Sequence, residues 1–267
     1  MEKQSNTIFK FYRIMTKEQL LEGCKYAENA FIGVKSHVTL DKKLIKENLD
    51  FTGKSILDFG CGMGGMTLWY ATQWNCQVTG IDIDPNHIEI AEILRTKHKV
   101  KNVQFELRNI LEKPLTEKYD YIILNDVAEH IPLWILKTIL EQLQKALSPK
   151  GRIFVSYPPW EGPYASHLNH VLTLPWCQFL PKSWLKSLVK NKDRKLVGTK
   201  TILQEYEELN HLNHTLLNEI IEEVGLQITY RKSHSKWNNW KPLANKNLRV
   251  GPFKYFITKE LLLLSNK

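Results

Sequence analysis

The sequence predicts an α/β fold in which a mostly parallel, doubly wound sheet carries helices on both faces. From residue 54 onward, apolar runs of strand length alternate with segments of helical periodicity. Repeated units of this length imply right-handed crossovers between parallel strands. The first run, "KSILDF", leads directly into "GCGMGG", and a glycine loop between a strand and a helix is typical of a turn that brings its backbone against a ligand.

Two helices are expected before the sheet begins. Thr16 and Gln19 form a capping box, and Leu20 and Ala27 belong to the apolar stripe of the helix that follows. A second, shorter helix is expected over "DKKLIKENL", residues 41–49.

Strands and helices then alternate along the chain. Asp84 caps one helix, with Pro85 at its first position, and Gly225 ends another. "LSPKGR" predicts a turn into the fifth strand, whereas the stretch 158–200 breaks the alternation. The predicted strands are 54–59, 77–83, 103–108, 119–124, 152–157, 226–232 and 260–265. Helices are predicted over 66–74, 133–147 and 214–224, and another begins after Asp84.

Composition places the chain among globular proteins of one large domain. It has 267 residues, of which 43% are hydrophobic and 24% charged. Neither a signal peptide nor an apolar run of membrane-spanning length is recognised, so a cytoplasmic location is expected. The four cysteines form no C-x-x-C pair, which predicts neither a disulfide framework nor a metal site.

The net charge of +9 is concentrated late in the chain. Residues 174–200 carry seven Lys or Arg and one acid, and residues 227–254 carry seven and none. These patches are either solvated surface or a surface for an anionic partner, and both interpretations stay open.

Asp58 decides what the glycine loop binds. Gly60, Gly62 and Gly65 match G-x-G-x-x-G, but Asp58 stands two residues before the first glycine and would repel a pyrophosphate. A ligand with a cation would be favoured, and S-adenosylmethionine carries an ammonium and a sulfonium. Asp82, at the end of the next strand, is placed to bind ribose hydroxyls.

With these motifs in order, the chain resembles the class I S-adenosylmethionine-dependent methyltransferases, in the type 11 or ubiquinone-biosynthesis-like branch. "ILDFGCGMG", "VTGIDID", "ELRNI", "YDYIILNDVAEHI" and "LSPKGRI" carry the resemblance, which covers residues 54–157. It implies a Rossmann-like, seven-stranded sheet whose last strand is antiparallel. It also implies S-adenosylmethionine as the cofactor.

The resemblance implies roles for individual residues. Asp58, Gly60 and Gly62 would hold the methionine end of the cofactor. Asp82 would bind the ribose, while Asn109 stands where the family usually has an acid that receives the adenine amino group. Further contacts are implied for Ile83 and Ile110 at the adenine, and for Asn125 at the methionine moiety.

Transfer to a hydroxyl needs a base as well as positioning. His130, after the fourth strand, and His167 and His170, after the fifth, are the candidates, and the last two would share one face of a helix. Each is also compatible with a structural role. "SYPPW" is similar to a motif that grips planar nitrogens, but it follows the wrong strand, so Pro158 and Pro159 are interpreted as a rigid exit from the sheet.

The expected organisation is a single domain, 1–267, in four parts. Residues 1–53 form a helical cap, 54–157 the cofactor-binding core, 158–200 an acceptor lid, and 201–267 the last helix and strands. Residues 158–195 are expected to be mostly helical, with Lys182, Lys186 and Lys190 beside an apolar stripe, "WLKSLV", that suits an amphiphilic acceptor or a membrane surface.

The predicted function is methylation, at oxygen, of a small molecule or of a glycan- or lipid-linked precursor. An RNA methyltransferase that uses the basic patches is the alternative. It is disfavoured because those patches lack regularly interleaved aromatic residues. A non-catalytic cofactor-binding subunit is a third reading, against which the intact loop argues.

Overall fold

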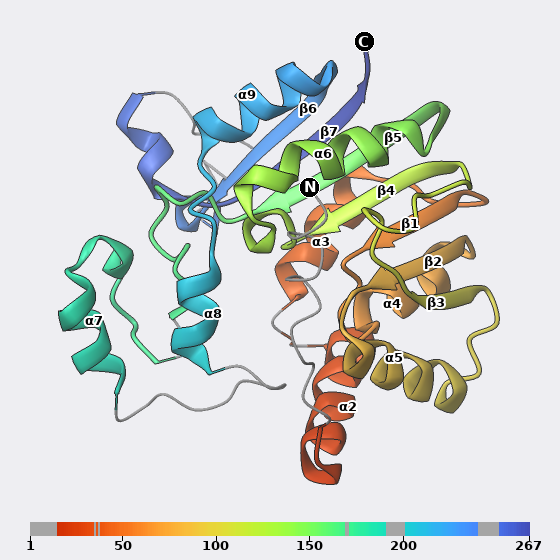
Figure 1. Ribbon diagram of the computed structural model, residues 1–267, viewed down its shortest axis with the longest axis horizontal. Coiled ribbons are helices and arrows are strands. Elements are labelled where there is room, and N and C mark those ends of the chain that lie inside the picture. The colour runs from red at the N-terminus through yellow and green to blue at the C-terminus, as the bar shows by residue number, and fades with distance from the viewer. Residues whose placement is uncertain (1–14, 35, 37, 169–170, 191–200, 240–250) are drawn as a thin grey trace. The chain divides into compact units, whose positions relative to one another are not determined.

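The computed structural model describes residues 15–34, 36, 38–168, 171–190, 201–239 and 251–267. Its strands form a seven-stranded sheet in the order β3-β2-β1-β4-β5-β7-β6 (Figure 1). The last strand is antiparallel to its neighbours, so the predicted fold class is confirmed. The chain divides into two compact units, one that extends to Asn109 and one that begins at Ile110.

The first unit contains three parallel strands and the helices that connect and cover them. Thr16 and Gln19 form the predicted capping box, with the Gln19 N–H donating to Thr16 Oγ1 at 3.3 Å and the Thr16 N–H donating to Gln19 Oε1 at 3.0 Å. Asp84 Oδ1 accepts the Asn86 N–H at 2.9 Å and starts the next helix. The elements are α2 (Lys17–Ile32), α3 (Thr39–Asn48), β1 (Ser55–Phe59), α4 (Gly65–Trp74), β2 (Gln77–Asp82), α5 (Pro85–Lys97) and β3 (Val103–Leu107).

The second unit contains the remaining strands, with β4 parallel to β5 and β7 antiparallel to both β5 and β6. Helices α6 and α9 pack against each other and against this part of the sheet (Figure 1). The elements are β4 (Tyr119–Asn125), α6 (Leu133–Lys145), β5 (Leu147–Tyr157), α7 (Lys182–Val189), α8 (Ile202–Glu208), α9 (His214–Val224), β6 (Leu226–Ser235) and β7 (Ile257–Asn266).

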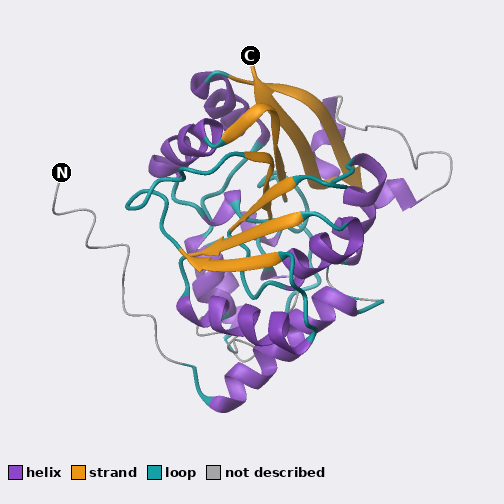
Figure 2. Cartoon of the chain, turned by 90° about the vertical axis from the view of Figure 1, so that its right-hand side faces the viewer, coloured by secondary structure: helices purple, strands orange, loops and turns teal. Residues whose placement is uncertain are grey.

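Strand β7 forms the apolar centre of the second unit. Its leucines, residues 261–264, are all buried, as expected for a strand that lies between two others and is covered on both faces. Figure 2 shows this strand reaching the C-terminus within a twisted ribbon of long strands. In the described part of the chain, no helix is both long enough and apolar enough to span a membrane.

The turn expected over residues 147–152 is wrong, because β5 already begins at Leu147. Tyr119 pairs with Leu147 but Tyr121 pairs with Arg152, so β5 absorbs the extra residues as an irregularity in register. Gly151 is required there, since a Cβ would lie 2.8 Å from the Tyr119 carbonyl oxygen.

The segment after β5 contains a helix, α7, but the expectation that it is mostly helical is wrong. Before α7 the described residues form turns, bends and short 3₁₀ segments such as Cys177–Phe179. The physical reason is the density of prolines, which remove backbone donors and fix φ. They stand at positions 158, 159, 163, 175 and 181.

Candidate functional site

The glycine loop between β1 and α4 turns through three residues of positive φ. Gly60, Gly62 and Gly64 have φ values of 71°, 52° and 78°, which other residues rarely adopt. The N–H groups of Gly60 and Cys61 donate to the Ile81 carbonyl at 2.8 and 3.0 Å. The loop is therefore tied to the end of β2.

Two of these glycines are needed for different reasons. A Cβ on Gly64 would lie 2.7 Å from Ala91 Cβ and 2.7 Å from Phe105 Cζ, so Gly64 allows close packing. A Cβ on Gly62 would meet no described atom within 4 Å. The backbone at Gly62 thus faces open space, as a loop that approaches a ligand requires.

Asp82, at the end of β2, supports this loop with its carboxylate. Its Oδ2 accepts the Gly62 N–H and its Oδ1 accepts the Asp84 N–H, both at 2.8 Å, and His87 Nδ1 lies 3.5 Å from Oδ1. Burial acts to raise the pKa of Asp82, but His87 and the two N–H donors hold that pKa below its usual value. An ionised carboxylate suits ribose hydroxyl donors, and that role stays a prediction.

Asp58 lies beneath the loop with only 4% of its surface exposed. Thr67, in the first turns of α4, donates its hydroxyl to Asp58 Oδ2 at 2.6 Å. Burial raises the pKa of Asp58 to about 7, against the effect of the Thr67 hydrogen bond and with a further increase from Asp82. A cation beside Asp58 would favour its ionised form, so the carboxyl fits a cationic ligand better than a pyrophosphate.

Apolar surface flanks the loop on the same unit. Ile83 follows β2 and is 43% exposed, and Leu107 ends β3 and is 53% exposed. Asn109, two residues further, is half-buried. An exposed apolar side chain next to the ionised carboxylate of Asp82 suits an adenosine, whose base is apolar on its faces and whose ribose donates hydrogen bonds. This unit therefore suits the cofactor that the resemblance implies.

The other two predicted cofactor residues belong to the second unit. Ile110 is 2% exposed. Asn125 ends β4, and its Oδ1 accepts the Ser156 hydroxyl of β5 at 2.7 Å. Neither contact with the cofactor is tested by these observations, and both stay predictions.

The turn that follows β4 holds a buried carboxylate that the sequence did not single out. Glu129 lies in a 3₁₀ turn, Ala128–His130, and is 3% exposed. Among the described residues, neither of its carboxylate oxygens has a hydrogen-bond partner. Burial raises the pKa of Glu129 well above its usual range, and the nearby Asp126 adds to the increase.

His130 and His167 gather around Glu129. Their ring centroids are 5.1 Å apart, and His167 Nε2 lies 3.8 Å from Glu129 Oε1. His167 Nδ1 lies 3.2 Å from Glu205 Oε1 of α8. Burial acts to lower the pKa of His167, but Glu205 and Glu129 raise it above its usual value.

The expected helix that would carry two histidines on one face is wrong. His167 lies in a bend with φ 57°, and His170 lies outside the described residues. The structure therefore brings His167 to His130 through the chain path between β5 and α7. Sequence periodicity held no signal for that proximity.

Asn210 fixes the turn that presents Glu129 and His130. Its side-chain amide donates to the carbonyls of Ala128 and Ile131, each at 2.7 Å, and its N–H donates to the Glu129 carbonyl at 2.9 Å. The sequence analysis missed Glu129, Glu205 and Asn210. The only local signal was the acid beside His130 directly after a buried strand.

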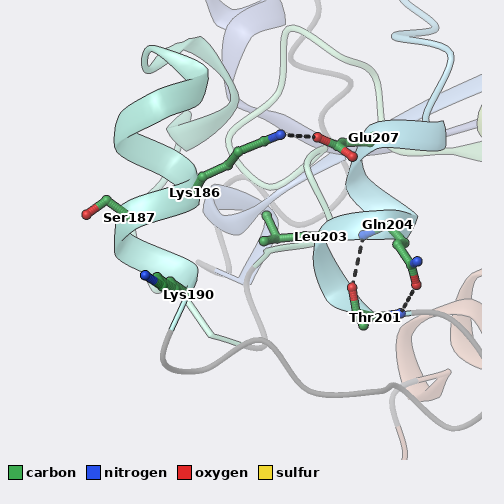
Figure 3. Close-up of a pocket in the computed structure, with 7 residues that line it drawn as sticks. All are labelled: Lys186, Ser187, Lys190, Thr201, Leu203, Gln204 and Glu207. Atoms are coloured by element: carbon green, nitrogen blue, oxygen red, sulfur yellow. Dashed lines mark hydrogen bonds and ion pairs between the residues drawn. The ribbon is translucent and has the colours of Figure 1, made fainter.

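The predicted lid helix α7 packs against α8 through one face. Leu185 and Val189 are buried in an apolar cluster with Ile202 and Tyr206, whereas Trp184 is 63% exposed. Lys186 Nζ pairs with Glu207 Oε1 at 2.8 Å (Figure 3). A pocket between the two helices is lined by Lys186, Ser187, Lys190, Thr201, Leu203, Gln204 and Glu207.

Comparison with protein families identifies the chain's relationships. A family model described as a methyltransferase domain matches residues 50–247. A demethylmenaquinone methyltransferase of Lactococcus lactis subsp. lactis is 28% identical over 169 residues, which are 60% of this chain and 64% of that protein. An uncharacterised protein of Rickettsia prowazekii is 36% identical over 110 residues, 39% of this chain and 44% of that one. The alignments thus span less than two thirds of either relative.

Solved structures agree with the fold. The PH0226 protein of Pyrococcus horikoshii has a TM-score of 0.56 at 16% identity, covering 95% of this chain and 100% of that one. Coclaurine N-methyltransferase bound to N-methylheliamine and S-adenosylhomocysteine also has a TM-score of 0.56, at 14% identity, covering 99% of this chain and 85% of that one. The family match, the strand order and the motifs agree, and the chain belongs to the class I S-adenosylmethionine-dependent methyltransferases.

Proposed function

We propose that this chain transfers a methyl group from S-adenosylmethionine to a hydroxyl oxygen of a small molecule or of a glycan- or lipid-linked precursor. The observation that carries the choice of oxygen is the cluster of Glu129, His130 and His167 in the second unit. The cofactor supplies a methyl group on an activated sulfonium. A neutral hydroxyl must still lose its proton, and this cluster supplies groups that take protons.

On the cofactor side, each residue would recognise one chemical feature. The ionised form of Asp58 would pair with the ammonium, and Asp82 would accept from the ribose hydroxyls. Gly60 and Gly62 would allow close backbone approach. Ile83, Asn109 and Ile110 would contact the adenine, and Asn125 the methionine moiety.

On the acceptor side, either His130 or His167 would take the hydroxyl proton. His130 is exposed, whereas His167 is oriented by Glu205 at 3.2 Å. The raised pKa of His167 makes its ring a stronger base, and the ring would take the proton in its neutral form. His170 remains a third candidate, outside the described residues.

The names of the relatives support small-molecule methylation without selecting the atom. One relative is a tocopherol O-methyltransferase of Arabidopsis thaliana, and another is an (S)-coclaurine N-methyltransferase of Thalictrum flavum. Oxygen is favoured because "SYPPW" is built into the core here. Tyr157 is fully buried, and its hydroxyl donates to Glu260 Oε2 at 2.7 Å, so it does not grip an amide or base.

The segment around α7 would form the lid over an amphiphilic acceptor. Its outer face pairs exposed apolar groups, Trp184 and Leu188, with the cations Lys182 and Lys190. Lys186 is the weaker candidate for acceptor binding, because it already pairs with Glu207. Lys190→Glu should raise the acceptor KM and leave cofactor affinity unchanged, with Lys186→Glu combined with Glu207→Lys as the control that restores helix contact.

The catalytic assignment is tested by histidine replacement. A panel of hydroxylated acceptors is screened for release of S-adenosylhomocysteine, and His130→Gln and His167→Gln are compared with His98→Gln, which removes a histidine paired to Glu28 at 2.7 Å. At least one of the first two should lower kcat by about 10²-fold or more, the usual contribution of a general base. Cofactor affinity should not change. Wild-type turnover in both variants would show that the cluster takes no part in the reaction.

A further inference from the structure

We propose that Glu129, His130 and His167 form a binding site for a divalent transition-metal ion. One ligand atom from each residue lies within 4.8 Å of the other two. Two imidazole nitrogens and one carboxylate oxygen are a ligand set that Zn²⁺, Fe²⁺ and related ions accept. The cysteines play no part in it, so the cysteine spacing that predicted no metal site does not bear on this one.

The surroundings of Glu129 indicate a bound cation. Its side chain is 97% buried, since 3% is exposed, yet neither oxygen accepts a hydrogen bond from a described residue. His167 Nε2 lies 3.8 Å from Oε1, which is within ion-pair distance but beyond hydrogen-bond distance. A buried carboxylate is kept only when it is paired, neutralised or bound to a metal.

His167 is oriented as a metal ligand would be. Its Nδ1 faces Glu205 Oε1 at 3.2 Å, and its Nε2 faces Glu129. In metal sites the ligating histidine commonly donates its other ring N–H to a carboxylate, which fixes the tautomer and the direction of the ring. Glu205 is in that outer position and acts through His167.

The three ligand atoms would need to move only a short distance to reach the spacing of a metal site. Metal bonds of about 2.0–2.2 Å to nitrogen and oxygen place the ligands of a tetrahedral site roughly 3.4 Å apart. The present separations are all within 4.8 Å. His130 is exposed, and Asn210 holds the backbone of the turn through three hydrogen bonds.

Asp126 is close to this site but is already neutralised. Its charge raises the pKa of both Glu129 and His167. However, its Oδ2 accepts from Lys259 Nζ at 2.6 Å. Glu129 is therefore the carboxylate of the site, and Lys259 limits the negative charge around it.

Binding of the ion does not depend on the proposed reaction, but it refines that proposal. An acceptor hydroxyl on the open coordination position would have its pKa lowered by the ion. The two histidines would then serve as ligands in place of the general base, and the hydroxyl would release its proton to solvent as its oxygen receives the methyl group.

The test is metal binding by the whole chain, purified without a histidine tag. Equilibrium dialysis with Zn²⁺ should give a single ion per chain, and Co²⁺ should give visible absorption that Zn²⁺ abolishes. Glu129→Gln, His130→Gln and His167→Gln should each weaken binding at least tenfold, and Glu205→Gln should weaken it about tenfold, as outer ligands do. His98→Gln, at a His–Glu pair outside the cluster, should bind as the wild type does.

Thermal melting separates lost ligands from lost folding. Zn²⁺ should raise the Tm of the wild type. Glu129→Gln should melt no lower than the metal-free wild type, because it removes a buried acid whose oxygens accept no hydrogen bond from a described residue, and should gain nothing from Zn²⁺. Absence of saturable binding, or wild-type affinity in Glu129→Gln and His130→Gln, would overturn the site. Methyl transfer that persists without metal would leave the proposed function standing.

Discussion

At the scale of single residues, the protonation of Asp58 should control cofactor binding. Burial raises the pKa of Asp58 to about 7, so the free protein holds both forms near neutral pH. The ligand's ammonium favours the ionised form. Affinity should therefore be full above pH 7 and should fall as the pH drops below it.

Calorimetry with S-adenosylhomocysteine, which carries the same ammonium, measures this effect. Below its pKa the loss should approach tenfold per pH unit, the limit for one titrating group. Asp58→Asn should bind more weakly at about pH 8 and show a flatter profile. A wild-type affinity that is constant between about pH 6 and 8 would contradict the role of Asp58.

A second buried carboxylate, Glu260 of β7, is fully paired and serves stability. Its Oε2 receives the Tyr157 hydroxyl at 2.7 Å and lies 2.6 Å from His214 Nδ1, and Arg231 lies 3.4 Å from Oε1. Burial acts to raise the pKa of Glu260, but His214 and Arg231 hold that pKa below its usual value.

Glu260→Gln should therefore lower the free energy of unfolding. The expected loss is about 1–3 kcal/mol at neutral pH, measured by urea unfolding. Since the pKa of Glu260 is depressed by folding, this stabilisation is present above the unfolded value of about 4.3 and disappears as pH falls through the folded value. An equal urea midpoint for both proteins at neutral pH would show that the pairing contributes nothing.

At the scale of elements, two glycines of the loop between β1 and α4 have different roles, one in ligand binding and the other in packing. Gly62→Ala places a Cβ in open space, so its main structural cost is the strained φ of 52°, about 1–2 kcal/mol. Gly64→Ala adds contacts of 2.7 Å with Ala91 and Phe105. Gly62→Ala should fold and lose cofactor affinity, whereas Gly64→Ala should melt at a clearly lower temperature. A Gly62→Ala protein that binds as tightly as the wild type would place the ligand elsewhere.

Elements were predictable where their signals are local. The capping box at Thr16, the Asp84–Pro85 start and the Gly225 end are each set by neighbours in the chain, and each is confirmed. The start of β5 at Leu147 was missed because it depends on pairing with Tyr119, which lies 28 residues earlier. The mostly helical segment expected before α7 did not form, because its prolines prevent helix formation.

At the scale of the whole molecule, motifs predicted the seven-stranded fold but could not predict the cluster of Glu129, His130 and His167. Asp58 and Asp82 lie at the ends of β1 and β2, so their positions follow from the strand assignments. His167 and Glu205 are 38 residues apart, and no periodicity links them. No sequence pattern singles out Glu129, because the burial of its carboxylate without a hydrogen-bond partner among the described residues arises only in the folded chain.

Calorimetric titration of the full chain with S-adenosylmethionine and, separately, with NAD tests the central claim most directly. We expect saturable binding of S-adenosylmethionine and no binding of NAD, because Asp58 disfavours a pyrophosphate at the loop. Asp82→Asn should weaken the first by about 1–3 kcal/mol, roughly 5- to 150-fold. Tight binding of NAD without binding of S-adenosylmethionine would contradict the account.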